Sequence, residues 1–204
     1  MPWEQHPLRR GAPMGTPQPA RKAARALVDP PAGFDDPLDM LLGCHRRIEK
    51  QLETLKRLRA HLDAKGIDAE ASATAESVLR YFRKAAADHH EDEAKDVFPR
   101  IAGRIAEAGE AARFHALRER LEAEHRGIDA AWSRLRKPLE GISEGLMRTL
   151  AREEVEAFAA TYAGHIATEE SALPELFARW LEPGDLEALG RAMAARRGVA
   201  FPPA

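Results

Sequence analysis

Histidines that are followed four residues later by a carboxylate recur along this 204-residue chain, and four of them constrain its fold most. Residues four apart lie on one face of an α-helix, so each pair predicts an imidazole and a carboxylate side by side on a helix. The pairs are His45 with Glu49, His89 with Glu93, His125 with Asp129, and His165 with Glu169. A fold for this chain must therefore accommodate four such pairs.

Long stretches rich in Ala, Leu, Glu and Arg, separated by Gly and Pro, predict four helices from Phe34 onward. We expect them from Pro37 to about Ala64, from about Ala69 to Phe98, from near Gly109 to before Pro138, and from near Ser143 to Pro174. Short connections favour antiparallel neighbours, so the predicted fold class is all-α, an antiparallel up-down-up-down four-helix bundle. A short extra C-terminal helix, Asp185 to Ala195, is expected across one end.

The first 33 residues differ from the rest, because they hold seven of the 14 prolines. Proline interrupts helices and such a segment buries little surface, so we predict an extended or disordered arm. A transit peptide is the alternative, against which the lack of serine and of an apolar stripe argues. The expected organisation is an arm at 1–33, the bundle at 34–181, and a C-terminal helix and tail at 182–204.

Composition excludes several classes of protein. The 31 basic and 33 acidic residues are interleaved, which argues against a nucleic-acid partner. No run of about 18 apolar residues occurs, and no signal peptide is recognisable, so we expect neither membrane insertion nor secretion. The single cysteine, Cys44, permits no intrachain disulfide, thiolate zinc site or iron–sulfur cluster. We infer a cytoplasmic protein.

A helical rotation of about 100° per residue puts each of the four histidines in the middle of an apolar stripe. His90 turns away from His89 and is expected on the flank, although a small rotation of its helix would bring it inward. Cys44 likewise turns away from His45. The other acidic residues between Asp88 and Pro99 are expected on a solvated face.

A lone histidine on an apolar face more often packs than binds metal. Burying four imidazoles with carboxylates is different, because each unpaired group costs a few kcal/mol, whereas dications compensate both charge and desolvation. We therefore interpret the four histidines as a metal-binding set. Tyr162, one turn before His165, is expected to fill the core.

Four segments carry a family resemblance. His45, then DHHEDEAKDVFP, EHRGID and HIATEESALP, occur in this order, and from about Phe34 to Leu181 the chain resembles hemerythrin-like (HHE cation-binding) domains. The resemblance implies a non-haem di-iron centre with an oxo or hydroxo bridge inside a four-helix bundle, with Mn or Zn as alternative metals. The positions that match the family's ligands are His45, His89, Glu93, His125, His165 and Glu169.

The chain also departs from the family pattern. The family's oxygen carriers take a fifth histidine from the third helix, where this chain has Leu121 before its histidine. On the fourth helix Glu170 stands next to Glu169. These departures weaken the expectation of reversible oxygen transport. We expect Glu49 and Asp129 to orient imidazoles rather than bind metal.

A ligand count favours a reactive centre over a structural one. Four histidines, two bridging carboxylates and a bridging oxygen leave about two of twelve positions open on two six-coordinate metals. Dioxygen, nitric oxide or peroxide are the small ligands that such positions accept. We expect a binding or sensing protein rather than an enzyme. The alternatives are a peroxide-consuming stress enzyme, an iron donor for damaged metal centres, or histidines that merely pack. No protein partner is identified.

Overall fold

The computed structural model describes residues 33–201, and every regular element in that span is helical. The elements are α1 (Pro37–Lys65), α2 (Ala69–Asp92), the π-helix η1 (Glu93–Val97), α3 (Phe98–Ala102), α4 (Ala108–Ser143), α5 (Arg152–Trp180) and α6 (Pro183–Arg196). The all-α class is confirmed. None of the helices among these residues is long and apolar enough to cross a bilayer. The predicted arm lies outside the described residues, apart from its last position.

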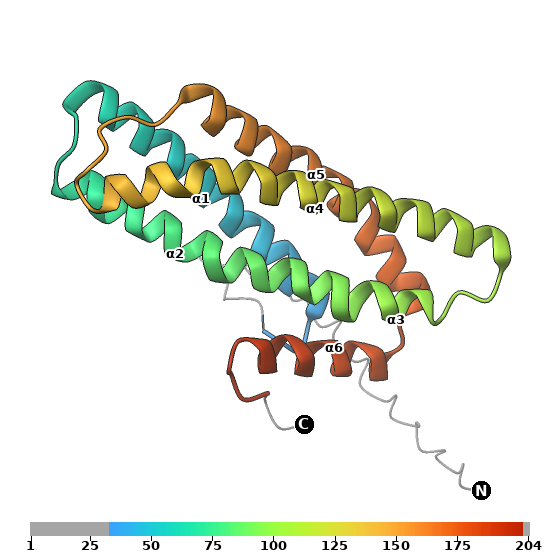
Figure 1. Ribbon diagram of the computed structural model, residues 1–204. Helices are drawn as coiled ribbons and strands as arrows, with labels where there is room; N and C mark the ends of the chain where they lie inside the picture. The colour runs from blue at the N-terminus through green and yellow to red at the C-terminus, as the bar shows by residue number, and fades with distance from the viewer. Residues whose placement is uncertain (1–32, 202–204) are drawn as a thin grey trace, which may run out of the picture. The chain divides into compact units, whose positions relative to one another are not determined.

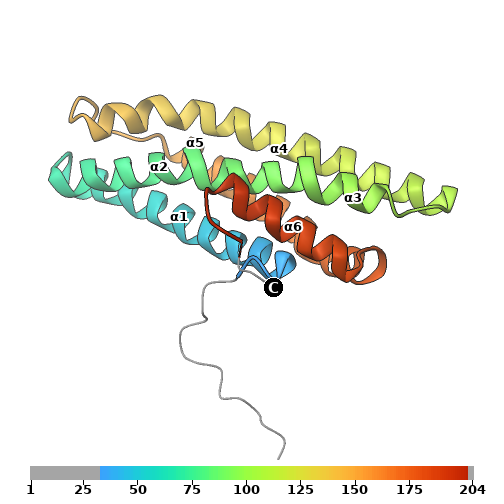
Figure 2. The ribbon, with the colours of Figure 1, turned by 90° about the horizontal axis from the view of Figure 1, so that it is seen from below.

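Four long helices, α1, α2, α4 and α5, lie side by side (Figure 1). Each packs against two of the others: α2 against α1 and α4, and α5 likewise against α1 and α4. The short helix α6 lies on the outside, against α1 and α2 (Figure 2). The short C-terminal helix expected from the sequence is therefore present, but it lies against the sides of α1 and α2 rather than across one end.

Side-chain caps fix where the first two long helices begin. Asp36 accepts a hydrogen bond from the backbone N–H of Asp39 at 3.0 Å, just before the first turn of α1. Asp68 accepts one from the N–H of Ala71 at 2.8 Å and caps α2. These caps satisfy N–H groups that have no partner within the helix. Between them Gly66 takes φ of 78°, a conformation that favours glycine, and ends α1.

Pro99 does not end the second long helix, contrary to the sequence prediction. The chain continues through η1 and α3 to Ala102. The N–H of Phe98 bonds to the carbonyl of Glu93, five residues back rather than four, so the turn before the proline is wide. This wide turn leaves room for the Pro99 ring, which would otherwise clash with the preceding turn.

Two other prolines also lie inside helices. Pro138 is within α4 and Pro174 within α5, so the predicted ends there are wrong. An interior proline costs about 3 kcal/mol, and burial of side chains beyond it, such as Leu139, offsets that cost. Because α4 continues to Ser143, the fourth long helix does not begin near that residue. It begins at Arg152, after a loop.

Buried apolar side chains form two clusters, one towards each end of the long helices. The first apolar cluster includes Leu55, Val78, Leu135 and Phe158. The second apolar cluster includes Leu41, Phe98, Leu121 and Phe177. Between these positions along all four long helices lie the histidines that the sequence singled out. The interior is therefore apolar, then polar, then apolar along the helix axes.

Candidate metal centre

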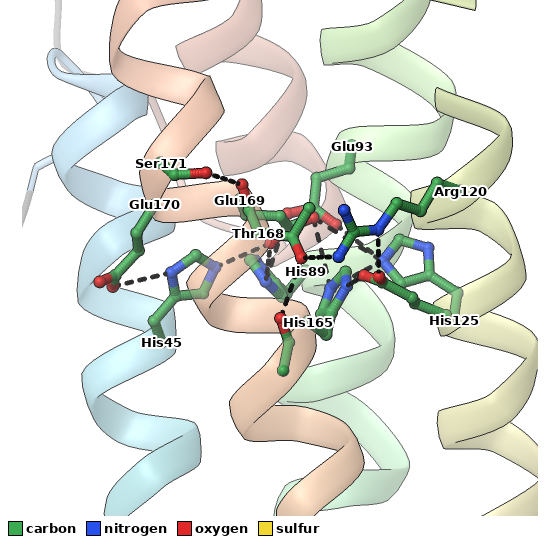
Figure 3. Close-up of polar contacts among 12 residues, drawn as sticks. His45, His89, Glu93, Arg120, His125, His165, Thr168, Glu169, Glu170 and Ser171 are labelled. Carbon is green, nitrogen blue, oxygen red and sulfur yellow. Dashed lines mark hydrogen bonds and ion pairs between the residues drawn. The ribbon is translucent and has the colours of Figure 1, made fainter. Parts of the chain in front are cut away.

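The four inward-facing histidines come from four different helices and converge on one point (Figure 3). His45 lies on α1, His89 on α2, His125 on α4 and His165 on α5. Their exposed fractions lie between 0% and 8%. The inward orientation predicted from helical phase is confirmed for all four.

Glu93 lies between histidines of two different helices and is fully buried. Its Oε1 is 3.3 Å from Nε2 of His89, on its own helical segment. Its Oε2 is 3.2 Å from Nε2 of His125, on α4. The carboxylate therefore turns one oxygen to each side.

Glu169 repeats this arrangement from α5. Its Oε2 is 3.0 Å from Nε2 of His45, and its Oε1 is 3.3 Å from Nε2 of His165. The latter nitrogen also lies 3.1 Å from Nε2 of His125. Two carboxylates thus join a histidine pair on α1 and α2 to a pair on α4 and α5. We refer to these residues as the polar layer: His45, His89, Glu93, His125, His165 and Glu169.

Several polar atoms here are buried without a hydrogen-bond partner among residues 33–201. They are both ring nitrogens of His89, both oxygens of Glu93, Oε1 of Glu169 and Nε2 of His90. The N···O distances are short, but the angles do not suit hydrogen bonds. Each unpaired buried group costs about 1–3 kcal/mol. Divalent cations would accept one lone pair from each imidazole and lone pairs from the carboxylate oxygens, so the donor set fits a metal centre.

The electrostatics of the polar layer point the same way. Burial lowers the pKa of His89 well below its usual value, and it lowers the pKa of His125 to about 4. Burial, followed by the nearby charge of Glu169, raises the pKa of Glu93. Without a cation, burial therefore favours the neutral form of His89 and His125 and the protonated form of Glu93. A cation would displace that proton, because metal ligands must be deprotonated.

Carboxylates outside the polar layer contact the far nitrogens of two histidines. Oε1 of Glu170 is 3.1 Å from Nδ1 of His45, and Oε2 of Glu124 is 3.2 Å from Nδ1 of His165. Such contacts fix the orientation of an imidazole and raise its basicity towards a metal. Both carboxylates sit on a neighbouring helix rather than on the helix of the histidine that they contact.

The residues predicted for this orienting role, Glu49 and Asp129, do not fill it. Both are exposed. The ring of His45 reaches across to α5, so its two nitrogens face Glu169 and Glu170 instead. The i+4 spacing places a carboxylate on the same helix but does not determine which way the ring turns.

Arg120 extends this network on α4. Its Nε donates to Oε1 of Glu124 at 2.8 Å, and its Nη2 donates to Oγ1 of Thr168 at 2.9 Å (Figure 3). The arginine therefore links α4 to α5 beside the layer. It also balances the charge of the outer carboxylate.

Asp92 corrects the expectation of a solvated acidic face. It is fully buried and pairs with both Arg196 and Arg197 from the end of α6. Burial raises the pKa of Asp92, while the two arginines act to lower it. Glu93 follows directly, at the start of the π-helix, a kind of turn that is frequent at functional sites. Helix α6 thus holds the segment that presents Glu93.

The other histidines among residues 33–201 divide into two groups. His61 and His115 lie away from the layer, beside Asp68 and Glu119 respectively. His90, expected on the flank, instead stacks on a histidine of the layer, and burial lowers its pKa to about 2.

Cys44 is buried outside the layer and accepts a hydrogen bond from Arg47. Tyr162 is also buried and belongs to the first apolar cluster.

Comparison with known proteins agrees with this geometry. The family model described as "Hemerythrin HHE cation binding domain" matches residues 36–176, a span that contains the whole polar layer. An uncharacterized protein of Haemophilus influenzae is 29% identical over 168 residues, which cover 82% of this chain and 94% of that protein. Since the family model matches more than half of its length, the chain belongs to the hemerythrin HHE cation-binding family.

Proposed function

We propose that the polar layer holds two iron ions and that the protein binds or senses dioxygen or nitric oxide there. The observation that carries the proposal is the split of each buried carboxylate, one oxygen towards the α1 and α2 histidines and the other towards those of α4 and α5. Carboxylates that bridge two metals present their oxygens in this way. The proposed ligands are His45, His89, Glu93, His125, His165 and Glu169.

The donor set favours iron or manganese over zinc. Imidazole and carboxylate ligands without thiolate suit iron or manganese, and zinc is less favoured. Bound iron would supply redox chemistry and positions for a small ligand. The chain's own residues supply neutral imidazoles, two charges from the bridging carboxylates, and orientation by Glu124 and Glu170.

The surroundings of the layer support binding of a small, weakly polar ligand. Apolar side chains flank it on both sides along the helices, among them Leu41, Leu121, Ile128 and Phe158. These side chains keep bulk water away from the interior. As part of the same proposal, we place these residues in an antiparallel up-down-up-down bundle at 34–181, in a cytoplasmic protein.

The test separates binding from turnover. The full chain is loaded with Fe(II) without air, desalted, and exposed in turn to dioxygen, nitric oxide and hydrogen peroxide. Binding predicts reversible absorption bands and no sustained consumption of ligand. Continuous consumption of peroxide would instead establish the alternative, a stress-response enzyme, and transfer of iron to an apo acceptor would establish an iron donor.

A matched pair of variants guards this test against adventitious iron. Glu93→Gln removes one bridging carboxylate, whereas Glu91→Gln changes an exposed carboxylate two residues earlier. We expect the bands to disappear in the first variant and to persist in the second. Identical bands in both variants would contradict the proposed site.

A further inference from the structure

His90 lies beside the six proposed ligands but is not one of them. It follows His89 on α2, and successive helix residues point about 100° apart, so the two rings leave the helix in different directions. The ring of His89 meets that of His45 edge-on, with 4.9 Å between centroids. The ring of His90 instead stacks on that of His125 on α4, with 4.1 Å between centroids and 21° between planes.

A nitrogen of His90 is placed as a metal ligand would be. A ring nitrogen lies within 4.8 Å of ring nitrogens of His125 and His165. Its Nε2 is buried and has no hydrogen-bond partner in the described part of the chain. Buried polar atoms are nearly always paired, so packing alone leaves this nitrogen unexplained.

We propose that His90 is a further ligand of the metal ion held by His125 and His165, an inference that rests on the proposed di-iron centre. With both carboxylates shared, that metal has three histidines and five protein ligands. The metal beside His45 and His89 has two histidines and four protein ligands. Because iron in such sites takes about six ligands, the latter metal keeps more free positions. An added small ligand therefore binds there and not at the metal of His90.

A cavity gives access to the other side of this imidazole. It has a volume of about 230 Å³, lies between α2 and α4, and is bordered by His90, Trp132 and Tyr162. Exposed Arg83 and Arg136 also line it, so it opens to solvent. Removal of the His90 side chain would leave a hole that free imidazole can enter through this cavity.

The first test combines truncation with chemical rescue. Wild-type protein and His90→Gly are loaded with iron, and the two iron environments are read by Mössbauer spectroscopy and by titration with azide. Wild type is expected to show two unequal iron environments and one bound azide per chain. His90→Gly should bind a second azide and lose one iron to a chelator at least tenfold faster. Millimolar imidazole should reverse both changes. His115→Gly, which places the same flexible residue at an exposed site on α4, is the control.

The second variant distinguishes ligation from packing. His90→Phe keeps an aromatic ring for stacking on His125 but has no lone pair. It should behave like His90→Gly but without rescue by imidazole. If a folded His90→Phe protein kept two unequal irons and one azide, His90 would only pack and the inference would be wrong. If wild type itself failed to retain two irons, the proposed function would fail first.

Discussion

The apolar clusters and the polar layer occupy the same four helices but satisfy opposite requirements. In the first apolar cluster, side chains such as Leu55 and Leu135 are completely buried among other apolar groups. In the polar layer, Glu93 is equally buried, yet both of its oxygens lack a hydrogen-bond partner among the described residues. The clusters stabilise the fold, whereas the layer destabilises it until something binds.

This difference shows how the chain can hold an unfavourable arrangement. Apolar burial contributes roughly 25 cal/mol for each Å² removed from water, on both sides of the layer. The helices are thus held in register without help from the histidines. The polar side chains are then kept at short distances before a metal arrives, so little reorganisation is needed on binding.

The largest effect should come from the layer itself. Glu93→Ala removes a carboxylate shared by the two proposed metals, so iron content should fall from two per chain to one or fewer. His89→Ala should act similarly, whereas His61→Ala, away from the layer, should retain both irons. Equal iron content in the three variants, measured by plasma emission spectrometry, would remove the distinction between the layer and the rest of the molecule.

A substitution in the apolar cluster should have the opposite signature. Leu135→Ala creates a cavity in a fully buried site and should reduce the free energy of unfolding by about 2–5 kcal/mol. Iron content at saturating metal should remain two per chain. Leu146→Ala is the control, because that side chain is 76% exposed. Chemical denaturation measures the difference, and loss of iron in folded Leu135→Ala would show that the two regions are not separable.

The carboxylates outside the layer should have intermediate effects. Glu170→Gln removes the charge that faces Nδ1 of His45, and the loss of such a contact typically weakens metal affinity about 10–100-fold. Glu175→Gln, an exposed change on the same helix, should leave affinity unchanged. Competition with a chromogenic chelator gives the two affinities. If the Glu170→Gln protein kept wild-type metal affinity, the carboxylate of Glu170 would have no role in metal binding.

The last comparison concerns the pH dependence of the stability of the apo-protein. The pKa values of His89, His90 and His125 lie below 6.5 in the folded protein. Below about pH 6.5 the unfolded chain therefore binds protons that the folded chain does not bind, which lowers the free energy of unfolding. The raised pKa values of Glu93, Asp92 and Asp129 act in the opposite sense. The histidines begin to act at a higher pH than the carboxyls, from about pH 6.5 downward, so stability should fall as pH drops from about 6.5 to about 4.5. One excess proton corresponds to about 1.4 kcal/mol per pH unit.

Denaturation at several pH values checks this prediction. A folded His125→Leu variant, which lacks one of the three histidines, should show a flatter dependence. Stability of the wild-type apo-protein that rises as pH falls would contradict the assignment of neutral, buried imidazoles. The metal-loaded protein should also lose its ions at low pH, because protons compete for the same ligands.

The sequence predicted what depends on position along a single helix. Helical phase was sufficient to place His45, His89, His125 and His165 inside. The spacing of four selected exposed carboxylates as well as buried ones, and only the family resemblance singled out Glu93 and Glu169. The sequence did not predict contacts between different helices. Glu124 on α4 contacts a histidine on α5, and Glu170 on α5 contacts a histidine on α1. These contacts depend on how the helices are rotated relative to one another.

Two further sequence predictions, the helix end at Pro99 and the exposure of Asp92, were wrong for reasons that residue spacing does not reveal. The wide turn at η1 depends on a hydrogen bond between Phe98 and Glu93, which no residue spacing announces, and it carries the helix past Pro99. The sequence also predicted that Asp92 is exposed to solvent. Its partners, Arg196 and Arg197, are about a hundred residues away in the chain, so their contact with it could not be predicted. Long-range ion pairs of this kind leave no periodic signal.

Anomalous diffraction at the iron edge, from crystals of the iron-loaded chain, locates the proposed metals themselves. We expect two anomalous peaks within the polar layer, with Glu93 and Glu169 between them. One peak should lie beside His45 and His89, and the other beside His125 and His165. A single peak there, or peaks only at exposed carboxylates, would contradict a two-metal centre.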